Sequence, residues 1–530
     1  MKNSYKIKTL GVALSLVSIF SSCTGDFDEI NKDPNALTED QLDATLAGPS
    51  FGSALYAGIH NGSYSSPGVD DQGTWGIATG ILSSTFIQYL NCGYGTERND
   101  FSGFESRGWT RFYTVAVPAL NNAFKASVNN EQATAILKIW KVYMYNQMTD
   151  YYGPIPYTEA GNGKEKVNYD SVDFIYEDFF KLLDEANTTL SSTTLTSVAT
   201  LKGSDRVYDG SVEKWRRFGN SLRLRLALRI SDIQPAKAKT QAEAAVTAGV
   251  IETNDQSAYF KVSNITPNNL NMIVNGWGYT MTASMESILK GYNDPRLSRW
   301  FSPIASGGYQ GQPVGGLQDQ FGTTKFSMFN NDVLGTGSNP SSNLSESKNI
   351  EILMASENYL TRAEGALNGW NMGGTAQSLY ENGIRLSLAQ WGITDATAVN
   401  NYIAGNTLPV VPQIVTVYPS LTELLDIPVK LPVAWSSSAA NQRTQIAVQK
   451  YLALFPESWE SWADLRRSDA KVIYPILNTD NLDAGVGKSL MKRVIYVTNE
   501  YSANREAVTD AISKLGGPDS GGTKLWWDTK

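Results

Sequence analysis

Histidine is nearly absent from this chain of 530 residues, and its scarcity excludes several kinds of active site. His60 is the single histidine, so a zinc site built from several histidines and the metalloprotease motif HExxH are both missing. A Ser-His-acid triad would have to use His60, which lies in the Gly/Ser-rich stretch AGIHNGSYSSPG. We interpret His60 as an exposed loop residue, and the sequence therefore argues against histidine-dependent catalysis.

Basic residues and long apolar segments are scarce as well. The chain has 44 basic and 52 acidic residues, which gives a net charge of −8. An acidic chain is not attracted to nucleic acid or to anionic membranes. After the N-terminal residues, no segment approaches the roughly 20 apolar residues that a transmembrane helix needs. The 42% of hydrophobic residues are instead sufficient for a large core.

The N-terminus has the features of a secretory signal. Lysines precede the apolar run LGVALSLVSIF at residues 10–20, which is too short to span a bilayer, and Ser21, Ser22 and Cys23 follow it. Small residues directly before a cysteine form the bacterial lipobox, in which that cysteine is lipidated. We predict that residues 1–22 are a lipoprotein signal peptide and that Cys23 carries the lipid anchor. An ordinary cleaved signal with an incidental cysteine is the alternative.

The residues behind Cys23 indicate where the anchored protein resides. The stretch CTGDFDEI places three acids close to it. In gut-type Gram-negative bacteria such a cluster is typical of lipoproteins exported to the outer face, although a solvated leader has the same composition. Removing residues 1–22 deletes three lysines and no acid, so the net charge changes from −8 to −11. With Cys23 lipidated, Cys92 has no cysteine to pair with, and we predict a free thiol there.

Helical periodicity dominates the rest of the chain. Apolar residues recur at steps of three and four in residues 171–190, 212–231, 350–368, 376–391 and 441–455. Pro456 ends the last of these, and its fixed φ suits the first turn of a further helix that carries Trp459, Trp462 and Leu465. Several amphipathic hairpins of this kind predict an α-solenoid core within one domain, residues 23–530.

Long polar loops rich in Gly, Ser and Asn separate the helices. The chief ones are residues 60–76, 91–108, 263–280, 302–345 and 405–440. Loops of this length in a compact domain are usually functional or disordered. Strand signals are few, and Val410 to Val417 is the best of them.

Several motifs together carry a family resemblance. They are MTDYYGPIPYTEA (148–160), WRRFGNSLRLRLALRIS (215–231), NDPRL (293–297), ILMASENYLTRAEGALNGW (352–370), QKYLALFPESWESWADLRRS (449–468) and GGTKLWWD (521–528). With the lipobox and the DFDEINKDPN leader, the chain resembles the SusD/RagB family of nutrient-binding outer-membrane lipoproteins. The resemblance implies a predominantly all-α, tetratricopeptide-like hairpin scaffold with loop insertions and minor β structure. It also implies a lid on a SusC-like TonB-dependent porin that receives captured glycans or other oligomers.

These motifs themselves have structural interpretations. NDPRL predicts a turn that leads out of a helix, with Asp294 as a cap. Trp459 and Trp462 share one helix face, which is more typical of core than of a binding platform. Arg466 and Arg467 near the helix end suit its dipole and free carbonyls. For Arg216, Arg217, Arg223, Arg225 and Arg229 we expect internal ion pairs rather than a cradle for an acidic glycan.

Sugar recognition needs aromatic faces and hydrogen-bonding groups on loops that a rigid scaffold holds. The candidate ligand-binding residues are Trp75, Tyr94, Asn275, Trp277, Tyr279 and Tyr309. The loop NNLNMIVNGWGYT is the best candidate, because two aromatics share a Gly-flanked, Asn-rich stretch. Each ring has the alternative role of anchoring its loop to the core. No motif implies a cofactor or a metal, and a calcium ion held by loop oxygens stays open.

The sequence leaves three functions open. The first is capture of a nutrient oligomer for a transporter, with a glycan as the leading candidate; starch, host N-glycan, fructan and peptide all remain as ligands. The second is a surface glycoside hydrolase, for which the acid pairs Asp70 with Asp71 and Glu97 with Asp100 are available. Acids are too common in this chain for such pairs to be specific. The third is a protein-interaction scaffold without a small ligand.

Overall fold

The computed structural model describes most of the chain after residue 42. The described residues are 43–59, 80, 82–91, 99, 104–164, 166–263, 266, 268, 270, 274, 278–317, 320–335, 348–481 and 486–530. Predictions for Cys23, His60, Trp75, Cys92, Tyr94, Asn275 and Trp277 lie outside these residues, and so do those for the leader acids and for the acid pairs. The chain divides into the units Met1–Asp43 and Ala44–Lys530, and every element below belongs to the second.

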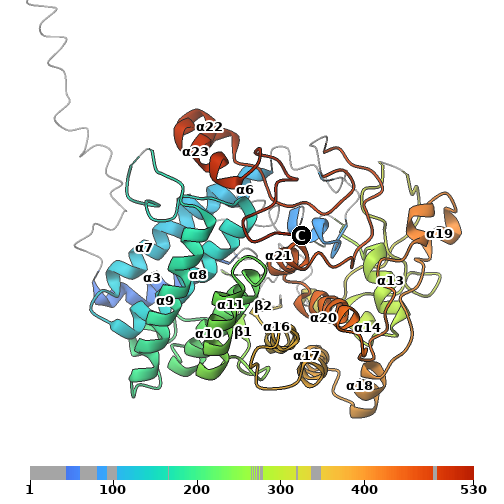
Figure 1. Ribbon diagram of the computed structural model, residues 1–530, viewed down its shortest axis with the longest axis horizontal. Helices are drawn as coiled ribbons and strands as arrows, with labels where there is room; N and C mark the ends of the chain where they lie inside the picture. Colours follow the sequence, from blue (N-terminus) through green and yellow to red (C-terminus); the bar gives the residue numbers. More distant parts are fainter. Residues whose placement is uncertain are drawn as a thin grey trace, which may run out of the picture. The chain divides into compact units, whose positions relative to one another are not determined.

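Antiparallel helical hairpins form the scaffold, as predicted. In the part of the chain drawn blue to green in Figure 1, α3 (Ala47–Ala57) packs on α7 (Val117–Ala126), and α8 (Glu131–Tyr152) pairs with α9 (Val172–Ser192). Helix α10 (Val212–Arg229) then packs between α9 and α11 (Pro235–Ala248). A second group consists of α16 (Ala355–Leu367), α17 (Ala376–Gln390), α20 (Ala439–Leu454) and α21 (Ser458–Ser468), and α10 contacts α16 to join the two groups.

Shorter elements connect these hairpins. They are η2 (Ala44–Leu46), α5 (Ser84–Phe86), α6 (Glu105–Arg111), the π-helix η4 (Phe112–Ala116), η5 (Ala199–Leu201), α13 (Ala283–Gly291), α14 (Leu297–Trp300), α15 (Asn331–Leu334), α18 (Ala396–Ile403), α19 (Ile414–Val417), η7 (Thr422–Leu425), α22 (Thr498–Ala503) and α23 (Arg505–Leu515). Over the described residues, no helix has both the length and the apolar character that crossing a membrane requires.

Local signals place several helix ends where the sequence indicates them. Helix α10 begins after Ser211, whose hydroxyl accepts a hydrogen bond from the Lys214 N–H. Helix α21 begins after Glu457, whose carboxylate accepts the N–H groups of Trp459 and Glu460. Pro456 therefore lies ahead of the first turn of α21 rather than within it, although it ends α20 as predicted.

The helix predicted over residues 350–368 is wrong in its first turn. Ile350–Leu353 form the strand β2, which pairs antiparallel with β1 (Ala258–Phe260), and α16 begins only at Ala355. All four residues of β2 are buried. Strand pairing satisfies their backbone groups there, and Arg225 also donates to the Ile352 carbonyl (3.3 Å).

The strand predicted at Val410 to Val417 is also wrong. Residues 414–417 form the helical turn α19, because Ile414 is buried in a small second core while Val410, Val411 and Val417 are exposed and pair with no strand among the described residues. The predicted loops are partly helical too, since α6 begins at Glu105 within 91–108, and α15 lies within 302–345. In residues 405–440, α19 and η7 are the helical turns.

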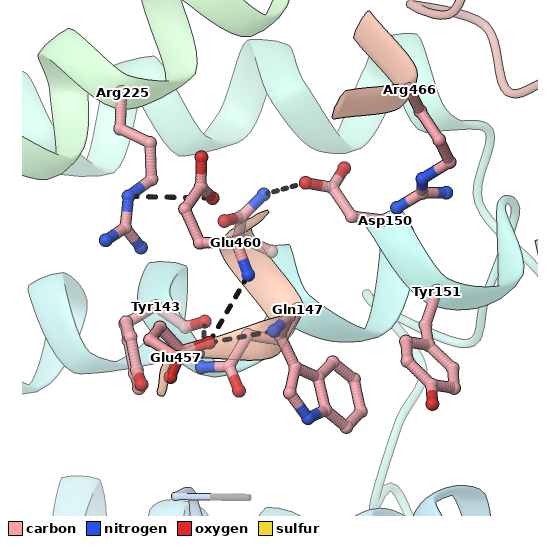
Figure 2. Close-up of a pocket in the computed structure, with 10 residues that line it drawn as sticks. Tyr143, Gln147, Asp150, Tyr151, Arg225, Glu457, Glu460 and Arg466 are labelled. Carbon is pink, nitrogen blue, oxygen red and sulfur yellow. Dashed lines mark hydrogen bonds and ion pairs between the residues drawn. The ribbon is translucent and has the colours of Figure 1, made fainter. Parts of the chain in front are cut away.

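Buried ion pairs join the two groups of hairpins, and they confirm the structural role expected for the arginines. Arg225 of α10 pairs with Glu357 of α16 (2.6 Å), and Arg229 pairs with Glu460 of α21 (2.6 Å). Burial raises the pKa of Glu460, and the two arginines oppose that rise. Figure 2 shows Arg225 of α10 turned toward Glu460 of α21, and Asp150 of α8 lines the same cavity. An ion pair of this kind is costly to break, because its charges are out of water.

Of the other three arginines that were expected to form internal ion pairs, two have largely exposed partners and the third contacts a backbone carbonyl. Arg217 pairs with Glu213 (3.0 Å) and Arg223 with Asp184 (3.1 Å), whereas Arg216 donates to the backbone carbonyl of Ala248. Trp459 and Trp462 are buried in the main core, as predicted. Arg466 donates to the Trp462 carbonyl (3.2 Å) near the end of α21, as expected, but Arg467 instead pairs with Glu364 and Asp464 (2.7 and 3.0 Å).

Glu351 on β2 makes the stability of the protein depend on pH. Its side chain is buried, and this burial raises its pKa to about 7. Because the folded protein holds this proton more tightly than the unfolded chain, the stabilising contribution is complete below about pH 4.5 and is lost as the pH rises through about 7. We expect this residue alone to lower the free energy of unfolding by about 3 kcal/mol over that interval.

Urea unfolding at about pH 5 and about pH 8 tests this, because Glu351→Gln should flatten the decline. Burial also raises the pKa of Asp205 and of Asp528, so part of the decline should persist in the variant. The control Glu213→Gln changes a glutamate whose side chain is 67% exposed, and it should keep the full decline. An undiminished decline in Glu351→Gln would contradict the assignment.

Candidate functional site

An open depression of about 380 Å³ lies on the loops next to α13. The described residues that line it are Gly278, Thr280, Gln312, Gly316, Leu317, Gln320, Phe321, Gly322, Thr324, Lys325, Phe326 and Met328. We call it the site depression. Its volume falls within the range of about 300–1,000 Å³ that is typical of small-molecule pockets. Its lining combines apolar side chains with amides and hydroxyls, and Lys325 is the only charged residue among the described residues that line it.

Backbone pairing between distant loops holds the walls of the site depression. Thr280 forms antiparallel bridges with Asn91 and with Met328, and Thr282 pairs with Gln312. The Thr280 hydroxyl donates to the side-chain carbonyl of Gln312 (2.9 Å). Four segments that the sequence separates by up to 237 positions therefore meet at one edge.

Glu286 of α13 fastens two of the long loops behind the site depression. Its carboxylate is fully buried, and it accepts the N–H groups of Gly311 (2.7 Å) and Gln413 (2.9 Å) while it pairs with Lys290 (2.8 Å). Gly311 has to be a glycine, because a Cβ there would lie 2.2 Å from the Thr282 carbonyl oxygen. The rigid position of these loops thus follows from one buried acid and one close backbone approach.

A second, smaller core forms the floor. Phe321 is buried with Ile414 and Leu424, and its ring meets that of Phe326 edge-on, with centroids 5.8 Å apart. Phe326 is only partly buried, and it lines the site depression. It therefore provides an aromatic ring at the surface, of the kind that packs against the apolar face of a sugar.

Of the predicted ligand-binding residues, two are described. Tyr279 is fully buried in the main core, a position that fits its alternative role of anchoring the loop. Tyr309 is partly exposed, and it packs against the main core without lining the site depression. Its carbonyl accepts a hydrogen bond from Lys290 (3.2 Å), and the next residue, Gln310, donates to the Lys325 carbonyl (2.9 Å).

The loop that the sequence favoured does reach the site depression. Gly278 and Thr280, which follow Trp277 in NNLNMIVNGWGYT, are among the residues that line it. Trp277 and Asn275 themselves lie outside the described residues and remain predictions. Sequence reasoning missed Phe326 and Gln312, which belong to the loop 302–345; an aromatic in a long polar loop was the available signal.

A second polar cavity is unsuited to a ligand. It lies between α8, α10 and α21, and Figure 2 shows its lining, which includes Tyr143, Gln147 and Glu457. It has a volume of about 10 Å³, which is room for about one water molecule and not for a sugar ring. The carboxylate of Glu457 accepts the backbone N–H of Trp459, and that of Glu460 pairs with Arg229. Among the described residues, no cluster of His, Cys, Asp and Glu is suited to hold a metal ion.

The fold and the site together define a helical-hairpin protein whose loops, rather than its helices, form the concave surface. Comparison with known proteins identifies the group. The model of the SusD-like family, described as SusD and RagB outer membrane lipoprotein, matches residues 29–528. The chain belongs to this family, and the resemblance noted in the sequence is confirmed.

Solved structures agree with this assignment. A chitin-binding SusD homologue from Flavobacterium johnsoniae is 31% identical, with a TM-score of 0.80 over 91% of this chain and 99% of that one. A SusD homologue from Bacteroides uniformis is 30% identical, with a TM-score of 0.76 over 92% and 100% of the two chains. A SusD-like protein from Bacteroides thetaiotaomicron is 26% identical, with a TM-score of 0.77 over 91% and 99%. Comparison with curated proteins gave no match.

Proposed function

We propose that this protein captures an oligosaccharide in the site depression at the outer face of the outer membrane and delivers it to a SusC-like TonB-dependent transporter. The observation that carries the proposal is the site depression itself, in which Phe326 offers an aromatic ring beside the amides of Gln312 and Gln320. Membership of a family of outer membrane lipoproteins supports the location. The lipid on Cys23 provides the attachment.

Chitin oligosaccharides are the first ligands to test, because the Flavobacterium homologue with 31% identity is described as chitin-binding. The lining suits such a ligand: an N-acetyl group has a methyl that can pack on Leu317 or Met328, which are 51% and 40% exposed. Its amide can pair with the side-chain amides of the two glutamines. A few such contacts give a binding free energy of about −4 to −8 kcal/mol, which corresponds to millimolar to micromolar affinity and permits release.

Isothermal titration with chitohexaose should detect this binding, and Phe326→Ala should weaken it about tenfold by removing the ring. The matched control is Phe174→Ala on α9, a phenylalanine that is 48% exposed and does not line the site depression. Trp277→Ala and Trp75→Ala test the predicted residues in the same assay. If Phe326→Ala binds every oligosaccharide in a glycan panel as tightly as the unchanged protein does, the site depression is not the site.

Delivery and the absence of catalysis need their own measurements. Deleting the gene should abolish growth on the captured glycan, as should deleting the gene of the partner transporter. Normal uptake after a clean deletion would contradict the proposed delivery to the transporter. We propose that the protein binds without cleaving and without a metal cofactor. Depolymerised products after incubation of the purified protein with the glycan would instead support a hydrolase.

A further inference from the structure

A second open cavity, of about 470 Å³, lies beyond the C-terminal end of α21. Four lysines are among the described residues that line it: Lys471, Lys488, Lys492 and Lys530. Asp469 is the one acid among the described residues of this lining. We call this the lysine cavity. The chain has a net charge of −8, so four ammonium groups around one cavity are a local excess of positive charge.

The ion pairs of these lysines leave donors free for a ligand. Lys492 pairs with Asp528 (3.0 Å), Lys530 with Asp232 (2.7 Å) and Lys488 with Glu423 (3.7 Å), and none of these three acids lines the cavity. Lys471 pairs with Asp469 (2.7 Å), which does line the cavity, and these two side chains are 75% and 44% exposed. An ammonium group has three N–H donors, so one acid does not saturate it. The pair of Lys488 with Glu423 is long, and both side chains are close to half exposed, so it holds the lysine weakly.

The walls between the lysines are largely apolar. Val472, Ile473, Ile476 and Leu490 line the cavity together with the exposed Ser489 and the buried Asn99, whose amide donates to the Ser489 carbonyl (3.0 Å). A free inorganic anion gains nothing from such walls. A ring with an apolar face and an attached anionic group fits both the walls and the lysines, and the volume suits one or two sugar rings.

The lysine cavity and the site depression lie on opposite sides of one shared wall. The Leu477 N–H donates to the Val314 carbonyl (2.9 Å), and the Asn478 side chain donates to the Gly315 carbonyl (3.0 Å). Gly316 and Leu317, which follow directly, line the site depression, while Ile476 lines the lysine cavity. The described linings share no residue.

We infer that the lysine cavity is a second sugar site that binds an acidic saccharide through a carboxylate or a sulfate group. This goes beyond capture in the site depression, whose described lining carries a single charge. The ammonium groups pair with the oxyanion, and Ile473 and Leu490 pack against the ring. The free energy of binding has a large ionic part, so the affinity falls as the salt concentration rises.

Titration of the whole protein with a galacturonate trisaccharide, a sulfated chondroitin disaccharide and chitotriose tests this, at low salt and at about 0.5 M NaCl. We expect an acidic sugar to bind, more weakly at high salt, and the double variant Lys471→Gln/Lys488→Gln to reduce its affinity about tenfold. Both lysines are 45% or more exposed, so the variant should fold normally, as circular dichroism would check. The chondroitin disaccharide carries a uronate carboxylate as well as its sulfate, so binding of this probe without binding of the galacturonate assigns the sulfate as the group recognised.

The control is Lys430→Gln, which removes a lysine that is 71% exposed and does not line the cavity, and it should leave the affinity unchanged. Three results would overturn the inference: no binding of either acidic sugar, equal binding by the double variant, or equally tight binding of polyglutamate. Loss of acidic-sugar binding in Phe326→Ala would also overturn it, because the ligand would then occupy the site depression. Failure of chitohexaose to bind, by contrast, affects only the proposed function.

Discussion

Replacing Asp294 by asparagine should lower the free energy of unfolding by about 3–5 kcal/mol. The carboxylate of Asp294 binds the guanidinium group of Arg296 through two hydrogen bonds (2.9 and 2.6 Å), and both side chains are fully buried. The remaining partners of Arg296 include Ser387 (2.8 Å) and Tyr402 (2.9 Å), which are neutral. The variant therefore leaves a buried charge without its counter-charge.

Urea unfolding of three variants separates this cause from general damage. The control Asp426→Asn breaks an ion pair with Lys430 in which the acid is 84% exposed, and it should cost less than about 0.5 kcal/mol. Adding Arg296→Met to Asp294→Asn removes the orphaned charge and should restore part of the loss. A loss below about 1 kcal/mol in Asp294→Asn would show that the pair is not needed.

Trp527→Ala should cost a similar amount, about 3–5 kcal/mol. The indole is fully buried, donates to Asp150 (2.9 Å) and is in cation–π contact with the guanidinium groups of Arg229 and Arg466, whose carbons are 5.0 and 4.9 Å from its ring centroid. Its loss leaves a large cavity, removes two cation–π contacts and takes one donor from the buried carboxylate of Asp150, which Tyr176 (2.7 Å) and Asn146 (3.0 Å) still bind.

The neighbouring residue provides the control for this prediction. Trp526 is partly exposed and meets only the edge of the core near Tyr176, with ring centroids 6.0 Å apart. We expect Trp526→Ala to cost about 1 kcal/mol, since less apolar area leaves water. Equal losses of unfolding free energy in the two variants, measured by urea unfolding, would show that the burial of the indole does not determine the loss.

The sequence predicts the hairpin scaffold well where one helix face is apolar and the other polar. Helix α9 follows its stripe closely, because Ile175, Phe179 and Leu183 face the core and polar residues face water. Helix α8 was not predicted from the sequence. It is buried on nearly every side from Ala133 to Tyr152, and its apolar residues therefore form no single stripe. Pairing with β1 likewise decided the conformation of Ile350–Leu353 against local periodicity.

The candidate site could be predicted only in part, for a different physical reason. The loop 263–280 was recognisable from its composition, yet the site depression also depends on residues 312–328, whose position comes from long-range pairing with Thr280 and Thr282. Composition cannot indicate which aromatic of a loop turns inward. Tyr279 fills the core and Phe326 stays at the surface, although both belong to similar polar stretches.

Contacts between residues far apart in the chain have a consequence for how this protein reaches its folded state. Ser83 hydrogen-bonds to Ser458 across 375 positions, Tyr89 donates to the Tyr451 carbonyl, and Trp527 reaches Asp150 across 377 positions. Such a topology has a high contact order, which makes folding slow and leaves early intermediates without a closed core. A nascent chain that lacks its last helices cannot finish folding. For the export that the signal peptide predicted at residues 1–22 implies, late folding keeps the chain competent for transport.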